Sequence, residues 1–171
     1  MDITTRFLKN EDAATLVELY RVIASKPGGF VRTEEEIDSV YVEKTLRTGE
    51  RAGIAIGAFD VERQRMIGAI TARKPGLKVF DHVLTGLIIG VQPEYQSQGI
   101  GRRLFLDFIE HVQANRPDIL RIELLARDSN QRQISFYEGV GFRREGFFEN
   151  RIRRSDGSFE GDVPMAWLKP D

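Results

Sequence analysis

Apolar residues recur along this chain with two different spacings, and each spacing predicts a different kind of element. Apolar positions three or four residues apart lie on one face of a helix. This spacing predicts helices over residues 12–24, from Thr33 onward, over 100–114 and over 131–138. Short runs in which apolar residues alternate or are continuous are typical of strands. Such runs are found at residues 2–8, 53–59, 65–73, 82–92, 119–126, 142–148 and 159–168.

Polar residues mark the starts of the first two helices. Asp12 precedes the first helix and can cap it. Thr33 is followed three residues later by Glu36, which is a capping box and predicts that the second helix follows there. The side chains expected to face inward from this second helix are Ile37, Val40 and Tyr41. The side chains expected to share the apolar face of the strand at 119–126 are Leu120, Ile122 and Leu124.

The order of these elements indicates the class of fold. In chain order they read β-α-α-β-β-β-α-β-α-β-β. A mixed order with few helices predicts an α/β (α+β) protein with a mixed, mostly antiparallel central sheet of six or seven strands, flanked by about four helices. The 171 residues suffice for one domain with a core of its own, so we expect a single domain over residues 1–171.

Composition excludes several kinds of function. The net charge of −1 gives no general attraction for nucleic acid or an anionic membrane. The absence of cysteine excludes disulfides, thiolate metal ligands and a cysteine nucleophile, and two histidines are too few for a histidine-rich metal site. The N-terminus lacks an apolar signal segment, and the longest uncharged apolar stretch is too short to span a bilayer. We therefore expect a cytoplasmic protein that uses no metal and binds neither nucleic acid nor membrane.

A glycine-rich turn at residues 96–102 carries the first chemical signal. It lies between the apolar run Leu84 to Val91 and the helix predicted at 100–114. Glycines allow a ligand to approach the backbone, and the first N–H groups of a helix attract negative charge, so this arrangement predicts a phosphate-bearing ligand. It matches neither a P-loop nor the dinucleotide fingerprint, whose third glycine would fall at Leu104. A tight turn that merely leads into a helix is the alternative.

Two segments together resemble the GNAT superfamily of N-acetyltransferases. Residues 91–101, Val-Gln-Pro-Glu-Tyr-Gln-Ser-Gln-Gly-Ile-Gly, resemble its acyl-CoA pyrophosphate motif Q/R-x-x-G-x-G/A. Residues 130–142 resemble its second signature, with Asn130, a tyrosine seven residues later and a closing Gly-Phe. The order of the elements around both segments also fits. Residues 157–166 are similar to members that acetylate free amino acids, polyamines or the N-termini of ribosomal proteins.

The resemblance implies acetyl-CoA as co-substrate and assigns residues to its binding. Backbone groups of Ile89, Gly90 and Val91 would pair with the pantetheine arm, although these residues can also be simply a core strand. Asn130 would hold a pantetheine carbonyl or hydroxyl, and its alternative role is a helix N-cap. The residues that would bind the pyrophosphate, mainly through backbone N–H groups, are Gln96, Ser97, Gln98, Gly99, Ile100, Gly101 and Arg102.

Catalytic groups are suggested by the same resemblance. Tyr137 is the candidate acid that donates a hydrogen bond or proton to the departing CoA thiolate, and its alternative role is a packed aromatic residue. The strand before the glycine turn lacks the acid that many members carry there. Glu123 on the next strand is the best substitute as a base, although an ion pair with Arg121 is the alternative. His82, acting through a water molecule, is another candidate.

The missing acid also bears on the acceptor. An α-amine has a reference pKa near 7.7–8.0 and is partly neutral without help, whereas a lysine-like amine near 10.4 is not. The sequence thus favours an α-amino acceptor, within a wider set of amino acids, polyamines and protein N-termini. The acidic residues at 34–38 could attract such an amine or could be a solvated helix start. Exposed edge strands are compatible with a homodimer, and the rival function is a CoA-binding sensor without turnover.

Overall fold

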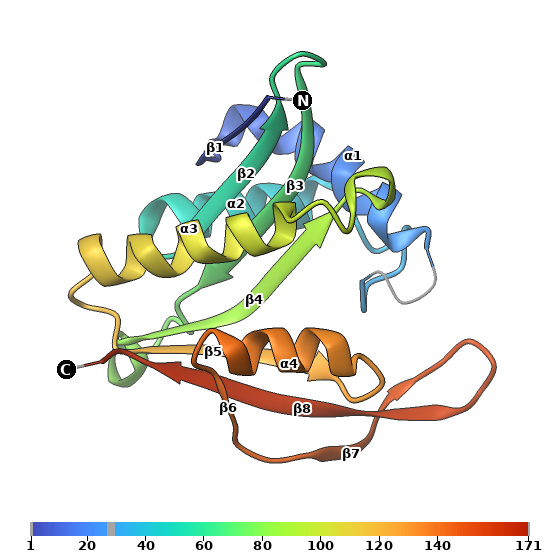
Figure 1. Ribbon diagram of the computed structural model, residues 1–171, viewed down its shortest axis with the longest axis vertical. Helices are drawn as coiled ribbons and strands as arrows, with labels where there is room; N and C mark the ends of the chain where they lie inside the picture. The colour runs from blue at the N-terminus through green and yellow to red at the C-terminus, as the bar shows by residue number, and fades with distance from the viewer. Residues whose placement is uncertain (1, 27–29, 171) are drawn as a thin grey trace. The chain divides into compact units, whose positions relative to one another are not determined.

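The computed structural model describes residues 2–26 and 30–170, apart from the side chains of Glu50 and Arg51 (Figure 1). Its helices are α1 (Ala13–Ala24), α2 (Ser39–Arg51), α3 (Ile100–Asn115) and α4 (Gln131–Gly139). Its strands are β1 (Ile3–Phe7), β2 (Ile54–Asp60), β3 (Arg65–Arg73), β4 (Val83–Val91), β5 (Arg121–Arg127), β6 (Arg143–Arg144), β7 (Phe148–Arg153) and β8 (Phe159–Leu168). Short 3-10 turns are found at η1 (Asn10–Asp12), η2 (Lys78–Phe80) and η3 (Pro93–Tyr95).

The strands pair in a mixed and mostly antiparallel pattern. Their hydrogen-bonded order is β1-β2-β3-β4-β5-β8-β6, and β7 also pairs with β8. The β4–β5 pair is parallel, whereas β1–β2, β2–β3, β5–β8, β6–β8 and β7–β8 are antiparallel. This confirms the predicted class of fold. The described chain has eight strands, one more than the upper end of the expected range.

The additional strand comes from the segment predicted as one strand at 142–148. There, Arg144 faces Met165 and Phe148 faces Asp162, so three residues of this segment lie opposite two residues of β8. Such an excess on one side is a bulge, and it interrupts the ladder. Pro164 lies opposite the bulge and has no N–H to donate, while its carbonyl accepts a hydrogen bond from the N–H of Glu145. The segment is therefore divided into β6 and β7.

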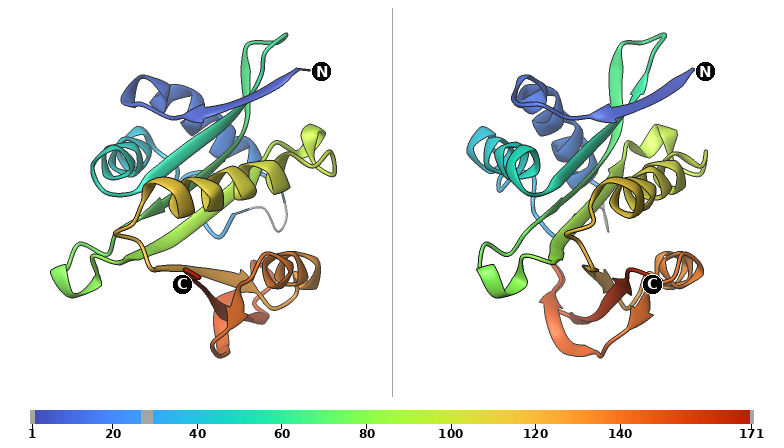
Figure 2. Two further views of the ribbon diagram at one scale, coloured as in Figure 1. Left: turned by 60° about the vertical axis from the view of Figure 1, so that its left-hand side comes forward. Right: turned by 90° about the vertical axis from the view of Figure 1, so that its left-hand side faces the viewer.

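The described chain consists of two compact units, and the first contains residues 1–74 and 88–117. Figures 1 and 2 show α1 and α2 on one face of β2 and β3, with α3 on the opposite face. Burial of apolar side chains between these layers stabilises the unit. The largest fully buried side chains of α1 and α3 are Leu16, Leu19, Tyr20, Leu104, Phe105 and Phe108.

Helix α2 begins later than the capping box predicted. Thr33 and Glu36 do form the expected contact, in which the Thr33 N–H donates to the Glu36 carboxylate at 2.9 Å. That contact closes only an isolated turn. The helix itself starts at Ser39, where Asp38 accepts a hydrogen bond from the N–H of Tyr41 at 2.7 Å. A second N-cap residue further along the chain therefore sets the start of the helix.

The later start changes which side chains of α2 face the core. Ile37 is fully buried, as predicted, but Val40 is 68% exposed and Tyr41 is only half-buried. Val42 and Leu46, one helical turn apart, are the residues that α2 buries instead. The prediction for Val40 was wrong because it counted the helical period from Thr33.

Asp12 lies directly before α1, but its side chain does not cap that helix. Its carboxylate accepts hydrogen bonds from the N–H of Lys9 at 2.8 Å and from the guanidinium of Arg6 at 2.7 and 2.8 Å. Arg6 lies on β1, so the carboxylate joins the strand to the start of the helix. The predicted cap is thus replaced by an ion pair that links two elements.

The second unit contains residues 75–87 and 118–171. Strand β8 pairs with β5 from Asp162 to Leu168 and with β7 nearer its start. Ile122 and Leu124 of β5 are buried as predicted, whereas Leu120, which directly precedes the strand, is 52% exposed. In the part of the chain that the structure describes, no helix is long and apolar enough to cross a membrane.

Candidate functional site

The glycine turn has the backbone geometry of an anion site. Ser97 and Gly99 both have left-handed backbone angles, with φ of 61° and 81°, and Gly99 is the N-cap of α3. A left-handed residue followed by a right-handed one turns successive N–H groups toward one concave side. The first bond at this end of α3 runs from the Arg103 N–H to the Gly99 carbonyl at 2.9 Å. The N–H groups that precede it have no acceptor within the helix and are suited to a phosphate.

The glutamine side chains of the turn stabilise its backbone and do not add hydrogen-bond donors for a ligand. The Gln96 amide donates to the carbonyl of Val91 at 3.1 Å, and the Gln98 amide donates to the carbonyl of Glu94 at 3.1 Å. Arg102 is exposed, and Arg103 is 3.8 Å from Asp107. We infer that backbone N–H groups, not glutamine side chains, are the donors that this turn offers.

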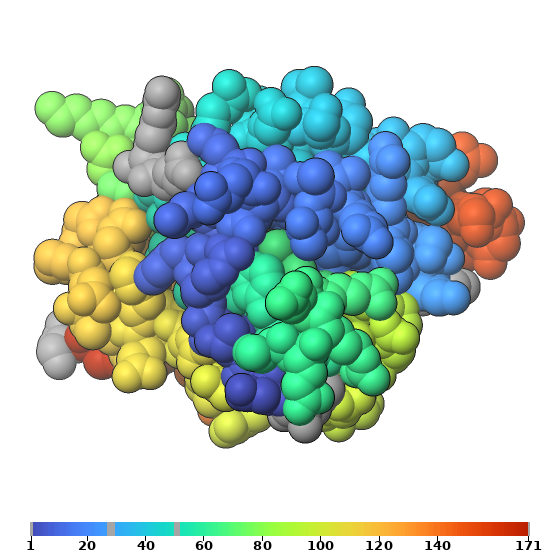
Figure 3. Space-filling model, turned by 90° about the horizontal axis from the view of Figure 1, so that it is seen from above, coloured from blue at the N-terminus to red at the C-terminus, as the bar shows by residue number. Residues whose placement is uncertain are grey.

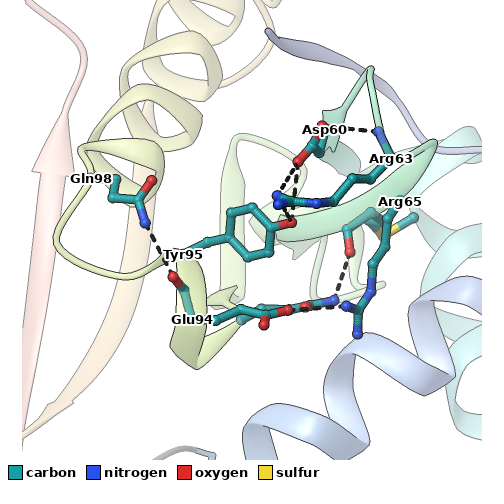
Figure 4. A network of polar contacts seen from close by, with 8 residues as sticks. Asp60, Arg63, Arg65, Glu94, Tyr95 and Gln98 are labelled. Carbon is teal, nitrogen blue, oxygen red and sulfur yellow. Dashed lines mark hydrogen bonds and ion pairs between the residues drawn. The ribbon is translucent and has the colours of Figure 1, made fainter. Parts of the chain in front are cut away.

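A buried carboxylate fastens the start of this segment to the β2–β3 hairpin. The Asp60 side chain is fully buried at the end of β2 and accepts hydrogen bonds from the Tyr95 hydroxyl and from the Arg63 guanidinium, each at 3.1 Å (Figure 4). The Arg63 N–H donates to the same carboxylate at 3.1 Å. Burial alone would raise the pKa of Asp60, but these hydrogen bonds together hold it below its ordinary value. Asp60 is therefore an ionised anchor for Tyr95.

Two further contacts join the same segment to the hairpin. Glu94 accepts a hydrogen bond from Arg65 at 3.0 Å, as Figure 4 shows. The buried Gln92 side chain donates to the carbonyl of Met66 at 2.9 Å. Figure 3 shows the hairpin turn at the surface between the N-terminal strand and the segment that follows β4. These anchors were not predicted from the sequence, because Asp60 and Tyr95 are 35 residues apart and no local pattern links them.

The three β4 residues assigned to pantetheine lie in the first unit, next to the turn. Gly90 is buried, whereas Ile89 and Val91 are half-buried. A Cβ atom at Gly90 would lie 2.6 Å from Ile23 and 2.8 Å from Phe30, so α1 and Phe30 approach this strand only because residue 90 has no side chain. The core role of this strand is thus evident. Pairing of its backbone with a ligand stays a prediction.

The pairing of β4 with its parallel neighbour β5 is short. Among the described residues, β4 pairs with β5 only at Val83–Arg121 and Leu84–Ile122. Shortly after these pairs, Gly86 has a left-handed φ of 61°, which breaks the regular extended backbone. The later part of β4 is therefore not committed to a ladder with β5. A strand with unpaired N–H and C=O groups is what an extended amide chain requires for binding.

In the second unit, helix α4 carries Asn130 and Tyr137 together with a residue that the sequence analysis missed. The Asn130 side chain caps the helix by accepting from the Gln133 N–H at 3.1 Å. Its amide donates to the Gln133 side-chain oxygen at 2.9 Å. The Gln133 amide in turn donates to the Tyr137 hydroxyl at 2.7 Å. The N-cap role of Asn130 is present, and Gln133 connects it to Tyr137.

Tyr137 is a buried phenol with a defined polar contact. It is 3% exposed and lies beside Phe136 and Phe142. Burial raises its pKa, and the hydrogen bond from Gln133 offsets only part of that rise. The phenol is therefore protonated at neutral pH and carries an O–H group. Its role in catalysis stays a prediction.

The candidate base Glu123 has the ion pair that was its alternative role. Arg121 donates to the Glu123 carboxylate at 2.7 Å and also binds Glu145, which lowers the pKa of Glu145. His82 is exposed, and its backbone carbonyl accepts from the N–H groups of Leu120 and Arg121 at 2.9 and 3.1 Å. These contacts give each residue a structural role, and basic catalysis by either stays a prediction.

The acidic residues at 34–38 and three arginines near the C-terminal end of the chain have the following surroundings. Glu34 lines a cavity of about 410 Å³ together with Glu18 and Arg21 of α1. Among the arginines, Arg144 pairs with Glu138, Arg151 with Asp162 and Arg154 with Glu160. No group of histidine, aspartate or glutamate side chains within the described ranges, 2–26 and 30–170, could hold a metal ion. The structure thus brings the turn together with Ile89, Gly90 and Val91 in one unit, and Asn130 together with Tyr137 in the other.

Comparison with known proteins gives one consistent result. A family model described as an acetyltransferase (GNAT) domain matches residues 54–144, more than half of the chain. The ribosomal protein bS18-alanine N-acetyltransferase of Escherichia coli K12 is 35% identical over 78 residues, which are 46% of this chain and 51% of that protein. The N-alpha-acetyltransferase RimI of Mycobacterium tuberculosis is 38% identical over 67 residues, 39% of each chain. The matched part thus spans about half the length, or less, of these curated relatives.

Solved structures extend the similarity of fold to nearly the whole chain. A GNAT-family acetyltransferase from Streptococcus pneumoniae has a TM-score of 0.79 at 25% identity and covers 98% of this chain and 99% of its own. The putative acetyltransferase yncA from Salmonella typhimurium, solved with acetyl-CoA, has a TM-score of 0.85 at 15% identity and covers 100% of this chain and 96% of its own. For yncA, at 15% identity, the similarity concerns the fold alone.

Proposed function

The chain belongs to the GNAT family of acetyltransferase domains, and from this membership we propose that it transfers an acetyl group from acetyl-CoA directly to a primary amine. The observation that carries the proposal is the geometry of the turn at 96–102. Its left-handed residues and the start of α3 present backbone N–H groups to an anion at the place where the family motif binds pyrophosphate. Direct transfer is supported by the absence of cysteine, which excludes a cysteinyl-acyl intermediate.

In the reaction that we propose, a neutral amine attacks the carbonyl carbon of the thioester. A C–N bond forms, the C–S bond breaks, and the electron pair of that bond leaves with the CoA sulfur. The amine loses one proton, and the thiolate needs one proton or a hydrogen-bond donor. We assign Tyr137 to donate to the sulfur, because its buried phenol stays protonated at neutral pH.

The acceptor that we favour is an α-amine, such as the N-terminus of a peptide. Two observations support this choice. Glu123 is held by Arg121, and an α-amine has less need of a strong base than a lysine side chain does. One curated relative is also named a ribosomal protein bS18-alanine N-acetyltransferase, and another is named an N-alpha-acetyltransferase. Amino acids and polyamines are the competing acceptors.

The test is release of CoA thiol from acetyl-CoA with a panel of amines. The panel contains an alanine-initiated peptide, the same peptide with a blocked N-terminus and one lysine, a free amino acid and a polyamine. We expect turnover with the free N-terminus and far less with the blocked peptide. Preference for another amine would overturn the choice of acceptor. If acetyl-CoA binds in calorimetry but no amine is acetylated, the chain is a CoA-binding sensor instead.

A further inference from the structure

Helix α4 contains a chain of hydrogen bonds whose direction is set at its first member. The Gln133 backbone N–H can only donate, so the Asn130 side-chain atom that meets it is the carbonyl oxygen. The other Asn130 atom is then the amide nitrogen, which can only donate, and its partner on Gln133 must be the side-chain oxygen. That leaves the Gln133 amide nitrogen to face Tyr137, at 2.7 Å from the phenol oxygen.

The direction of these hydrogen bonds determines where the O–H of Tyr137 can point. Because the Gln133 amide donates, the phenol oxygen accepts, and the O–H of Tyr137 cannot be directed at Gln133. A reversed chain, with an oxygen facing the phenol, would take up that O–H. We propose that Gln133 is a positioning residue that keeps Tyr137 a hydrogen-bond donor to its substrate. This inference rests on the proposed function for the role of Tyr137, but the hydrogen bond itself can be tested without it.

The placement of the three residues makes the arrangement local to one helix. Asn130, Gln133 and Tyr137 are three and four residues apart, so they share one face of α4. Gln133 is half-buried, and Tyr137 is buried. An amide that donates to the phenol oxygen also favours the ionised form over the neutral one, which makes the phenol a better acid than burial alone would leave it. Gln133 therefore affects both the direction of the Tyr137 O–H and the acidity of the phenol.

Substitution by glutamate reverses the contact with little change of shape. In Gln133→Glu a carboxylate faces the phenol and accepts its O–H, so the donor is taken from the substrate. We expect kcat to fall about 100-fold, as for loss of an acid, with KM for acetyl-CoA within about twofold of the parent. In Gln133→Leu the contact is only removed, and we expect a loss of roughly five- to tenfold in kcat.

The matched control is Gln131, which lies on the same first turn of α4 and is exposed. Gln131→Glu and Gln131→Leu repeat the same chemical changes away from the phenol and are expected to leave kcat within about twofold of the parent. The double variant Gln133→Glu with Tyr137→Phe is expected to be no slower than Tyr137→Phe alone, because Gln133 acts through Tyr137. A double variant that is much slower than Tyr137→Phe would contradict the proposal.

A second measurement is independent of activity. In protein labelled at the tyrosine ring carbon that bears the hydroxyl, the Tyr137 signal is assigned by its absence in Tyr137→Phe. Its chemical shift is expected to change in both Gln133 variants, further in Gln133→Glu than in Gln133→Leu because glutamate both removes the donor and accepts the O–H, and to stay in place in both Gln131 variants. An unchanged shift in Gln133→Leu would overturn the inference even if the protein acetylated no amine. A changed shift together with an unaltered kcat in Gln133→Glu would overturn the assigned role in catalysis.

Discussion

The glycine turn of the first unit and Tyr137 of the second unit are both held by polar side chains, but from different distances along the chain. The turn follows a segment that is fastened to the β2–β3 hairpin by Asp60, Arg65 and the carbonyl of Met66. Tyr137 is held by Gln133, four residues earlier on the same helix. The position of the glycine turn therefore depends on the tertiary fold, whereas the position of the Tyr137 hydroxyl depends largely on the geometry of one helix.

This difference predicts how substitutions elsewhere in the chain affect the glycine turn and Tyr137. Substitutions in the hairpin can shift the turn without touching it, and we expect them to act on the affinity for acetyl-CoA. Substitutions near Tyr137 should act on kcat, since a donor to the leaving thiolate is needed mainly in the transition state. The predictions below test this separation between binding and turnover.

The largest effect is expected at Gly99. Its φ of 81° suits glycine, and a Cβ there would meet nothing within 4 Å, so a small side chain fits. Gly99→Asp places a carboxylate at the proposed pyrophosphate site and should weaken acetyl-CoA binding by at least about 100-fold. Gly99→Asn is the matched control, because asparagine has the same shape, tolerates this φ and is uncharged. Calorimetry compares the two, and equal affinities would show that the turn does not bind the pyrophosphate.

The next largest effect is expected on kcat from a substitution of Tyr137 in the second unit. Tyr137→Phe removes the donor while it keeps the ring that packs beside Phe136 and Phe142. We expect kcat to fall by about 100-fold or more, with little change in the KM for acetyl-CoA. Steady-state kinetics with a good acceptor measures both constants. An unchanged kcat would exclude Tyr137 as the acid.

A smaller effect is expected from Asp60→Asn, which removes the charge that anchors the turn. Asparagine offers one acceptor where the carboxylate has three donors around it, so we expect the KM for acetyl-CoA to rise roughly tenfold with kcat nearly unchanged. A fall in kcat without a change in KM would contradict the separation between the two sites.

The loss of stability in Asp60→Asn is expected to depend on pH. The pKa of Asp60 lies below its ordinary value of 3.8, so its contribution to the free energy of unfolding is complete above that pH and is lost as the pH falls below it. The stability difference between parent and Asp60→Asn should therefore be largest near neutral pH and shrink in acid. Denaturant titrations at several pH values measure it, and a difference that grew in acid would refute the ion-pair anchor.

The smallest effect is expected from Tyr95→Phe, which removes one hydrogen bond to Asp60 and keeps the ring. The loss corresponds to about 1 kcal/mol, or roughly a fivefold rise in the KM for acetyl-CoA, and a similar loss of stability. Tyr41→Phe on α2 is the control for loss of a tyrosine hydroxyl. Equal effects of the two substitutions would show that the Tyr95–Asp60 bond does not hold the turn.

The two regions also differ in how far the sequence predicts them. The strand, glycine turn and helix at 84–114 follow from apolar periods and local backbone rules, and so does the helix that carries Asn130 and Tyr137. Gln133 could have been found as well, since an amide between Asn130 and Tyr137 at helical spacing is a local signal. The partnership of Asp60 with Tyr95 could not, because their contact arises only when the β2–β3 hairpin and the end of β4 are folded.

Errors in the predicted elements have the same origin. The start of α2 was misplaced because two N-cap signals, at Thr33 and Asp38, compete within a few residues and only the folded chain selects one. The division of the segment after α4 depends on Pro164, which lies far along the chain on the partner strand. Local patterns predict which elements exist, whereas their exact ends depend on partners that are distant in sequence.

The bulge between β6 and β7 has a consequence for assembly. The edge of the sheet that these strands form is interrupted, and its first part, β6, consists of Arg143 and Arg144 alone. Short, broken and charged edges discourage another strand from adding to a sheet. A second copy of the chain would gain little by extending the sheet here, so a homodimer would need the opposite edge, at β1, or another surface. The same feature disfavours edge-to-edge aggregation at these strands.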